Sequence, residues 1–115
     1  IVIRIEFIGL LKTKYSAKVF DLFDELKSQS GRFPDFEPDD FLLPNAEKEN
    51  IDRTFILNTL ITGIDPENFP DWKVICRTVR LSNPEKILKE TIDEGKFEGN
   101  NMDDSRIFID FVNDK

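Results

Sequence analysis

Histidine is absent from the 115 residues of this chain, and Cys76 is its only cysteine. Without histidine the chain cannot form a Ser-His-Asp triad, a Cys–His pair or a metal site that depends on imidazole ligands. A single cysteine excludes an intrachain disulfide and a Cys-x-x-Cys metal-transfer site. Cys76 falls inside a predicted strand, so we expect it to be a buried structural thiol and not a nucleophile.

Long apolar runs and targeting signals are also missing. No segment approaches the roughly eighteen consecutive apolar residues of a membrane-spanning helix. The first residues, IVIRIEFIG, lack the basic segment and the small-residue cleavage site of a signal peptide. We therefore expect a cytoplasmic protein that does not bind a membrane.

Positive charge is scarce, because 16 Lys and Arg stand against 23 Asp and Glu, a net charge of −7 at pH 7. An acidic surface repels phosphate groups, so this charge argues against nucleic acid as a partner and favours a basic protein. Apolar residues are plentiful, with 11 Phe and 13 Ile. They can build one hydrophobic core, and the length predicts a single domain over residues 1–115.

Four segments have the alternating apolar pattern of β-strands, and they cover residues 1–8, 53–62, 72–81 and 106–112. The second of them is ambiguous, because Ile56, Leu57, Leu60 and Ile61 could also form a helical stripe. We favour a strand there because the segment is short, rich in Thr, Ile and Phe, and followed by Gly63.

Two other segments have the apolar spacing of amphipathic helices. The first begins at Ser16, a good N-cap residue, and ends at Gly31. The second begins at Ser82, which forms a capping-box pattern with Glu85, and ends at Gly95. We therefore predict one helix between each of these pairs of end residues.

The predicted order of elements is β-α-β-β-α-β, which is the order of the ferredoxin-like plait, an α+β fold. That fold has an antiparallel four-stranded sheet with two helices on one face. A long acidic loop would follow the first helix. The other face of the sheet would stay open to a ligand, a partner or a second copy.

The predicted loop covers residues 32–50 and contains the acidic, aromatic stretch FPDFEPDDFLLP. Its prolines are incompatible with a helix or a central strand. Carboxylates that alternate with Phe suit a surface that attracts a basic partner by charge and holds it with aromatic rings. The predicted partner-binding residues are Asp35, Phe36, Glu37, Asp39, Asp40 and Phe41. Alternatively, these Phe side chains cover the sheet while the acids face water.

Two patterns imitate metal sites. Asp35, Glu37 and Asp39 have the spacing of calcium-loop ligands, but Asp40 stands where that loop needs glycine. Pro70-Asp71 followed by Glu94-Gly95-Lys96 has the PD…ExK form of carboxylate nucleases. In the nuclease pattern both parts must lie on adjacent strands, whereas we predict the second at a helix end. We therefore predict no catalytic residue, no metal and no cofactor.

The sequence favours a non-enzymatic acidic binding protein. Small immunity and inhibitor proteins have this size, this charge and this lack of catalytic residues, and they block a basic effector such as a toxin or a nuclease. The first alternative is a regulatory or oligomerising ferredoxin-like domain that binds a small ligand or a second copy, as a homodimer, through its open sheet face. The second alternative is a metal-dependent enzyme that uses carboxylates.

Overall fold

The structure is a computed structural model and describes residues 1–21, 24–33, 39–43, 53–80 and 82–111. These residues form eight strands and no helix. The strands are β1 Val2–Ile8, β2 Leu11–Asp21, β3 Asp24–Phe33, β4 Asp39–Leu42, β5 Thr54–Gly63, β6 Asp71–Arg80, β7 Asn83–Lys96 and β8 Met102–Asp110. The predicted α+β ferredoxin-like plait with two helices is therefore wrong.

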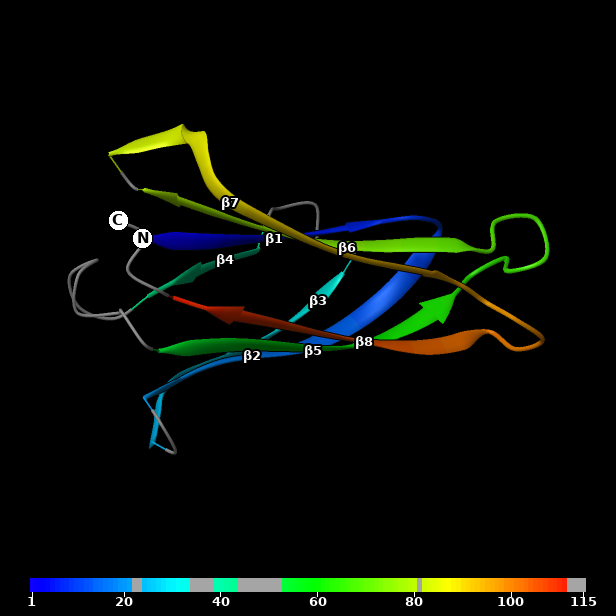
Figure 1. Cartoon of the computed structure of the whole chain (residues 1–115). Helices are drawn as coiled ribbons and strands as arrows, with labels where there is room; N and C mark the ends of the chain where they lie inside the picture. Colours follow the sequence, from blue (N-terminus) through cyan, green and yellow to red (C-terminus); the bar gives the residue numbers. More distant parts are fainter. Residues whose placement is uncertain (22–23, 34–38, 44–52, 81, 112–115) are drawn as a thin grey trace.

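The strands form two antiparallel sheets that pack face to face as a sandwich (Figure 1). The first sheet has the order β4-β1-β6-β7, and the second has the order β3-β2-β5-β8. Along each central strand, alternate residues point inward and are buried. These inward side chains form one hydrophobic cluster between the sheets, with Ile3, Phe41, Phe55 and Cys76 among its fully buried members.

The first predicted helix is a β2–β3 hairpin instead. In β2, Leu11, Tyr15 and Val19 are buried, and Lys12 and Lys14 between them are exposed. This strict alternation has a period of two and can bury one side of a strand, whereas a helix would spread the same residues around its circumference. The helical spacing from Val19 onward spans the end of one strand and the start of the next.

The second predicted helix is strand β7, which pairs with β6 alone at the edge of the first sheet. Ile87 and Ile92, two apolar residues of the predicted helix, are 47% and 46% exposed in the strand. Pro84 is the second residue of this strand, and an edge strand tolerates proline because one row of its backbone groups needs no partner. Long-range pairing with β6 therefore outweighs the local helical preference.

Strands form in all four predicted segments, as β1, β5, β6 and β8, but β8 begins at Met102, four residues before the predicted segment. Residues 81 and 112 of the predicted strands lie outside the described residues. The ambiguous segment is β5, and its inward residues include Phe55, Leu57 and Ile61. It is a central strand, since it pairs with β2 on one side and with β8 on the other. The predicted loop over residues 32–50 contains the short edge strand β4.

Side chains close both open edges of the sandwich. On one edge, Lys27 Nζ and Gln29 Nε2 of β3 donate hydrogen bonds to the carbonyl oxygens of Leu42 and Asp40 in β4, at 2.6 and 3.1 Å. On the other, the Ser105 hydroxyl of β8 donates to Asp93 of β7 at 2.6 Å. These contacts tie edge strands of different sheets together, and those from Lys27 and Gln29 occupy two carbonyls of β4 that a further strand would need. The part of the chain described here has no helix able to span a membrane.

Candidate functional site

Three turns meet at one end of the sandwich, and we call this region the turn end. It consists of residues 9–10, 64–70 and 97–101, which connect β1 to β2, β5 to β6 and β7 to β8, together with Ile8, the last residue of β1 (Figure 1). Backbone hydrogen bonds hold the turns together: Ile64 N donates to Leu10 O at 3.1 Å, and Phe97 N donates to Pro70 O at 2.9 Å. The three connections therefore form one continuous surface.

Glycines allow the close approach of backbone and rings at this end. Gly9 has φ of +135°, and a Cβ at this position would stand 2.8 Å from the carbonyl oxygen of Asp71. A Cβ at Gly95 would stand 2.6 Å from the ring of Trp72. That ring is held in place because its Nε1 donates a hydrogen bond to Asp103 at 2.9 Å. The base of the turn end is thus rigidly packed.

The turns present apolar side chains to solvent. Ile8, Leu10, Ile64 and Phe69 are 50%, 41%, 53% and 54% exposed. A hollow of about 660 Å³ lies beside Ile8, Leu10 and Phe69, and it is lined by residues 8–10, 68–73 and 94–96. Exposed apolar residues on a protein surface are usually scattered singly. Several large apolar side chains gathered in connecting turns around a hollow therefore indicate a binding surface.

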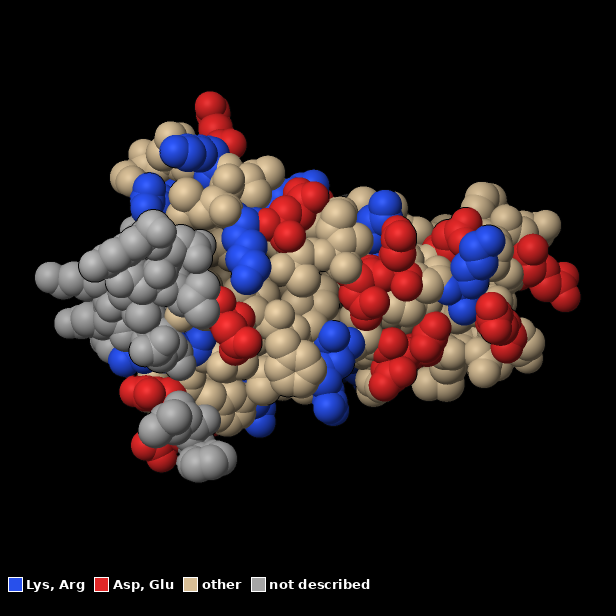
Figure 2. Space-filling model, viewed as in Figure 1, with Lys and Arg blue, Asp and Glu red and all other residues tan. Residues whose placement is uncertain are grey.

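Acidic residues surround these apolar side chains. The three turns contain Asp65, Glu67 and Glu98 and no Lys or Arg. Asp71 and Glu94, at the adjoining strand ends, each face a lysine, and those ion pairs cancel their charge. Figure 2 shows acidic side chains gathered over the half of the visible surface toward the turns. The uncompensated charge of the turn end is therefore negative.

Three of the predicted partner-binding residues, Asp35, Phe36 and Glu37, lie outside the described residues. Phe41 is in the core: it is 0% exposed, and its ring packs edge-on against Phe55 at 5.2 Å between centroids. For Phe41 the alternative interpretation holds, since its side chain covers the sheet and cannot reach a partner.

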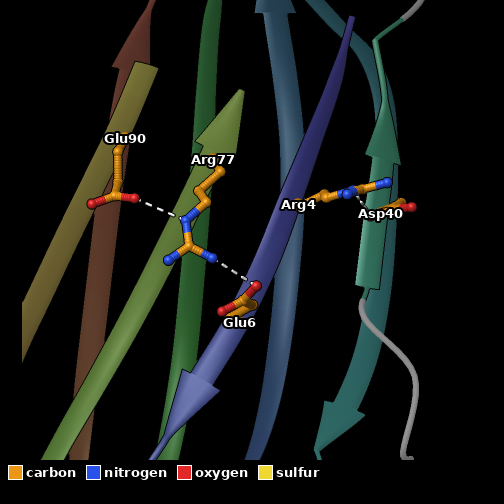
Figure 3. A network of polar contacts seen from close by, with 5 residues as sticks. All are labelled: Arg4, Glu6, Asp40, Arg77 and Glu90. Atoms are coloured by element: carbon orange, nitrogen blue, oxygen red, sulfur yellow. Dashed lines mark hydrogen bonds and ion pairs between the residues drawn. The ribbon is translucent and has the colours of Figure 1, made fainter. Parts of the chain in front are cut away.

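Asp39 and Asp40 begin the edge strand β4. Asp40 is exposed, and its carboxylate lies 3.5 Å from Nε of Arg4 on β1 (Figure 3). The same outer face carries Arg77, which donates hydrogen bonds to Glu6 and to Glu90, both at 2.8 Å. These bonds and charges raise the pKa of Arg77. The carboxylate of Asp40 is thus part of a cross-strand ionic surface on the first sheet, away from the turn end.

The two parts of the PD…ExK pattern lie on adjacent strands, so the prediction that Glu94 ends a helix is wrong. Asp71 pairs with Lys96 across β6 and β7, and Lys73 pairs with Glu94. Asp71 Oδ1 lies 3.7 Å from Lys96 Nζ, and Glu94 Oε2 lies 3.6 Å from Lys73 Nζ. Each carboxylate therefore has a cation beside it already. Within the described ranges, no cluster of three or more His, Cys, Asp or Glu is placed to hold a metal ion.

Cys76 lies on the inward face of β6, fully buried as predicted. Burial raises the pKa of its thiol to about 12, because the low-polarity core disfavours the thiolate. A thiol that stays protonated at neutral pH is a poor nucleophile. Cys76 therefore contributes packing to the core.

None of the partner-binding residues predicted from the sequence belongs to the turn end. A signal for the turn end is present in the segment IDPENFP, where Ile64 and Phe69 flank one proline and two acids in a turn that cannot bury them. Ile8 and Leu10 come from the β1–β2 turn region. Only the fold brings them close to Ile64 and Phe69, which are distant in sequence. No protein family, no curated protein sequence and no solved structure matches this chain.

Proposed function

We propose that the protein is a non-catalytic binding protein whose turn end docks onto a basic protein and blocks it, in the manner of an immunity or inhibitor protein. The observation that carries the proposal is the exposure of Ile8, Leu10, Ile64 and Phe69 beside acids that have no basic neighbour within the turns. Such a surface needs a partner with apolar pockets inside a positively charged rim.

The charge of the whole chain supports the same kind of partner. At −7 the protein attracts a basic protein from a distance, and the acids of the turns orient the encounter. The apolar side chains then determine how long the complex lasts, because buried anchors dominate the dissociation rate. The packed base beneath the turns limits the conformational entropy lost on binding.

The test is a kinetic comparison with the partner obtained by affinity capture from the native cell. Neutralising Asp65, Glu67 and Glu98 should slow association and flatten its dependence on salt. Phe69→Ala should instead speed dissociation by about tenfold, which corresponds to about 1.4 kcal/mol. Unchanged kinetics in both variants would remove the turn end from the interface.

A matched control is available at the opposite end of the sandwich. Asp21 and Asp24 are exposed acids at the β2–β3 hairpin, and Glu85 is an exposed acid at the start of β7. Neutralising them changes the net charge by the same amount as the turn-end variant. An equal effect of both triple variants on association would mean that total charge alone attracts the partner.

The alternative of a carboxylate enzyme has its own test. The chain is incubated with Mg²⁺ and with single- and double-stranded DNA and RNA, beside the Asp71→Ala variant. We expect no cleavage above background by either protein. Cleavage that Asp71→Ala abolishes while the fold is retained would contradict a non-catalytic function.

A further inference from the structure

The outer face of the second sheet differs in character from the turn end. Its side chains come from the exposed positions of β3, β2, β5 and β8. The strand register aligns these positions in rows, among them Lys14–Leu60–Asp104 and Lys18–Ile56–Phe108. We call this surface the β2–β5–β8 face.

Charge on the β2–β5–β8 face is divided between its two sides. Lys12, Lys14, Lys18 and Arg32 lie on the β3–β2 side, whereas β8 carries Asp104 and Asp110 with Arg106 between them. Lys18 forms an ion pair with Glu25 of β3 at 3.1 Å. Lys12, Lys14 and Arg32 are exposed and make no ion pair with any described residue. Basic side chains therefore dominate one side of the face, although acids outnumber bases in the chain as a whole.

Apolar side chains occupy the strip between and beside these charges. Leu60, Met102 and Phe108 are 58%, 57% and 53% exposed, and Ile56 lies in the same strip on β5. A shallow hollow of about 430 Å³ crosses β2, β5 and β8 next to Leu60. The face thus combines an apolar centre with complementary charges on its two sides.

We propose that the β2–β5–β8 face binds a second copy of this chain, with the two sheets packed face to face about a two-fold axis that runs along β5. This axis places β2 of one copy over β8 of the other. Lys14 then meets Asp104 of the second copy, and Leu60 meets Leu60 of the second copy. An axis perpendicular to the strands would instead place the lysines of β2 over one another, at an electrostatic cost.

The size of the face fits a weak dimer. The axis along β5 superposes β2, β5 and β8, whereas β3 of each copy lies beyond β8 of the other. Three strands spaced about 4.8 Å apart, each roughly ten residues long, cover about 480 Å² on each copy. The two copies together bury about 950 Å², which is below the range of stable specific interfaces and typical of weak, transient ones. We therefore expect a dissociation constant in the micromolar range.

A polyanion such as single-stranded RNA fits this face less well. Asp104 and Asp110 lie on the same surface as the lysines, and they would repel phosphates. In a dimer the same carboxylates are the groups that the lysines bind. Self-complementary charge therefore favours a second copy.

The experiment is sedimentation velocity of the whole chain from micromolar to millimolar concentration. Lys14→Asp and Asp104→Lys alone should each weaken dimerisation by about tenfold or more, because each places like charges opposite one another. The double exchange, K14D/D104K, should restore the wild-type constant to within about threefold. Leu60→Lys should abolish the dimer, whereas Leu42→Lys, at a 47% exposed position on the other sheet, should not.

Several results would overturn the proposal. A monomer at every concentration, a dimer insensitive to Leu60→Lys, or no rescue by the double exchange each contradicts it. So does binding of a labelled oligouridine, followed by fluorescence anisotropy, that Lys14→Asp abolishes. Phe69→Ala should leave dimerisation unchanged, so that failure of this proposal and failure of the turn-end function can be distinguished.

Discussion

The ring of Phe41 lies between the two sheets, whereas the ring of Phe69 stands in a turn and is 54% exposed. Phe41→Ala should lower the free energy of unfolding by about 3–5 kcal/mol, because it removes buried surface and leaves a cavity. Phe69→Ala should change it by less than about 0.5 kcal/mol. Urea denaturation measures both. A stable Phe41→Ala variant would place that ring outside the core.

Cys76 gives a prediction about pH at the scale of one residue. Burial raises the pKa of its thiol from the ordinary 9.0 to about 12 in the folded protein. Between these values the unfolded chain loses the thiol proton while the folded chain keeps it, so stability falls as pH rises. The contribution of Cys76 is complete below pH 9 and is lost as the pH approaches 12.

The measurement is the urea midpoint at about pH 8 and about pH 10.5, with Cys76→Ala as the control that cannot titrate. The wild type should lose more stability over this interval than the variant does. Equal losses in the two proteins would show that the thiol does not contribute. Disulfide-exchange reagents should also leave the native thiol intact at neutral pH.

At the scale of elements, the side chain of Arg77 links three strands. It lies on β6 and donates hydrogen bonds to Glu6 on β1 and Glu90 on β7. Arg77→Met should cost about 1–2 kcal/mol, because two carboxylates lose a well-oriented partner. Lys73→Met should cost at most about 0.5 kcal/mol, since its pair with Glu94 is long and exposed. Thermal unfolding of both variants checks the difference, and equal losses would contradict the network in Figure 3.

Elements with one clear period were predictable from the sequence. The segments that became β1, β5, β6 and β8 alternate, and this period of two identified each of them as a strand. The two predicted helices failed for different reasons. The β2 alternation runs through Thr13 and Ala17, which are weak hydrophobic signals although both are buried. In β7 the local sequence favours a helix, and only pairing with β6 selects a strand.

At the scale of the whole molecule, the composition predicted an acidic surface, but it did not predict where the candidate binding surface lies. The absence of histidine and the acidic charge were readable at once. The turn end combines residues from three connections that are distant in sequence. Leu10, Phe69 and Glu98 come one from each connection, and no local sequence pattern unites them. The predicted acidic stretch is contiguous, yet Phe41 of that stretch belongs to the core.

The most direct test of the turn-end function is amide hydrogen exchange of the whole chain, alone and in complex with the basic protein captured from the native cell. Binding at the turn end should slow exchange at residues 8–10, 64–70 and 97–101, because a partner excludes water from those amides. The β2–β3 hairpin at the opposite end should exchange as in the free protein. Protection confined to the hairpin or to the outer face of the first sheet, with the three turns unchanged, would contradict the account.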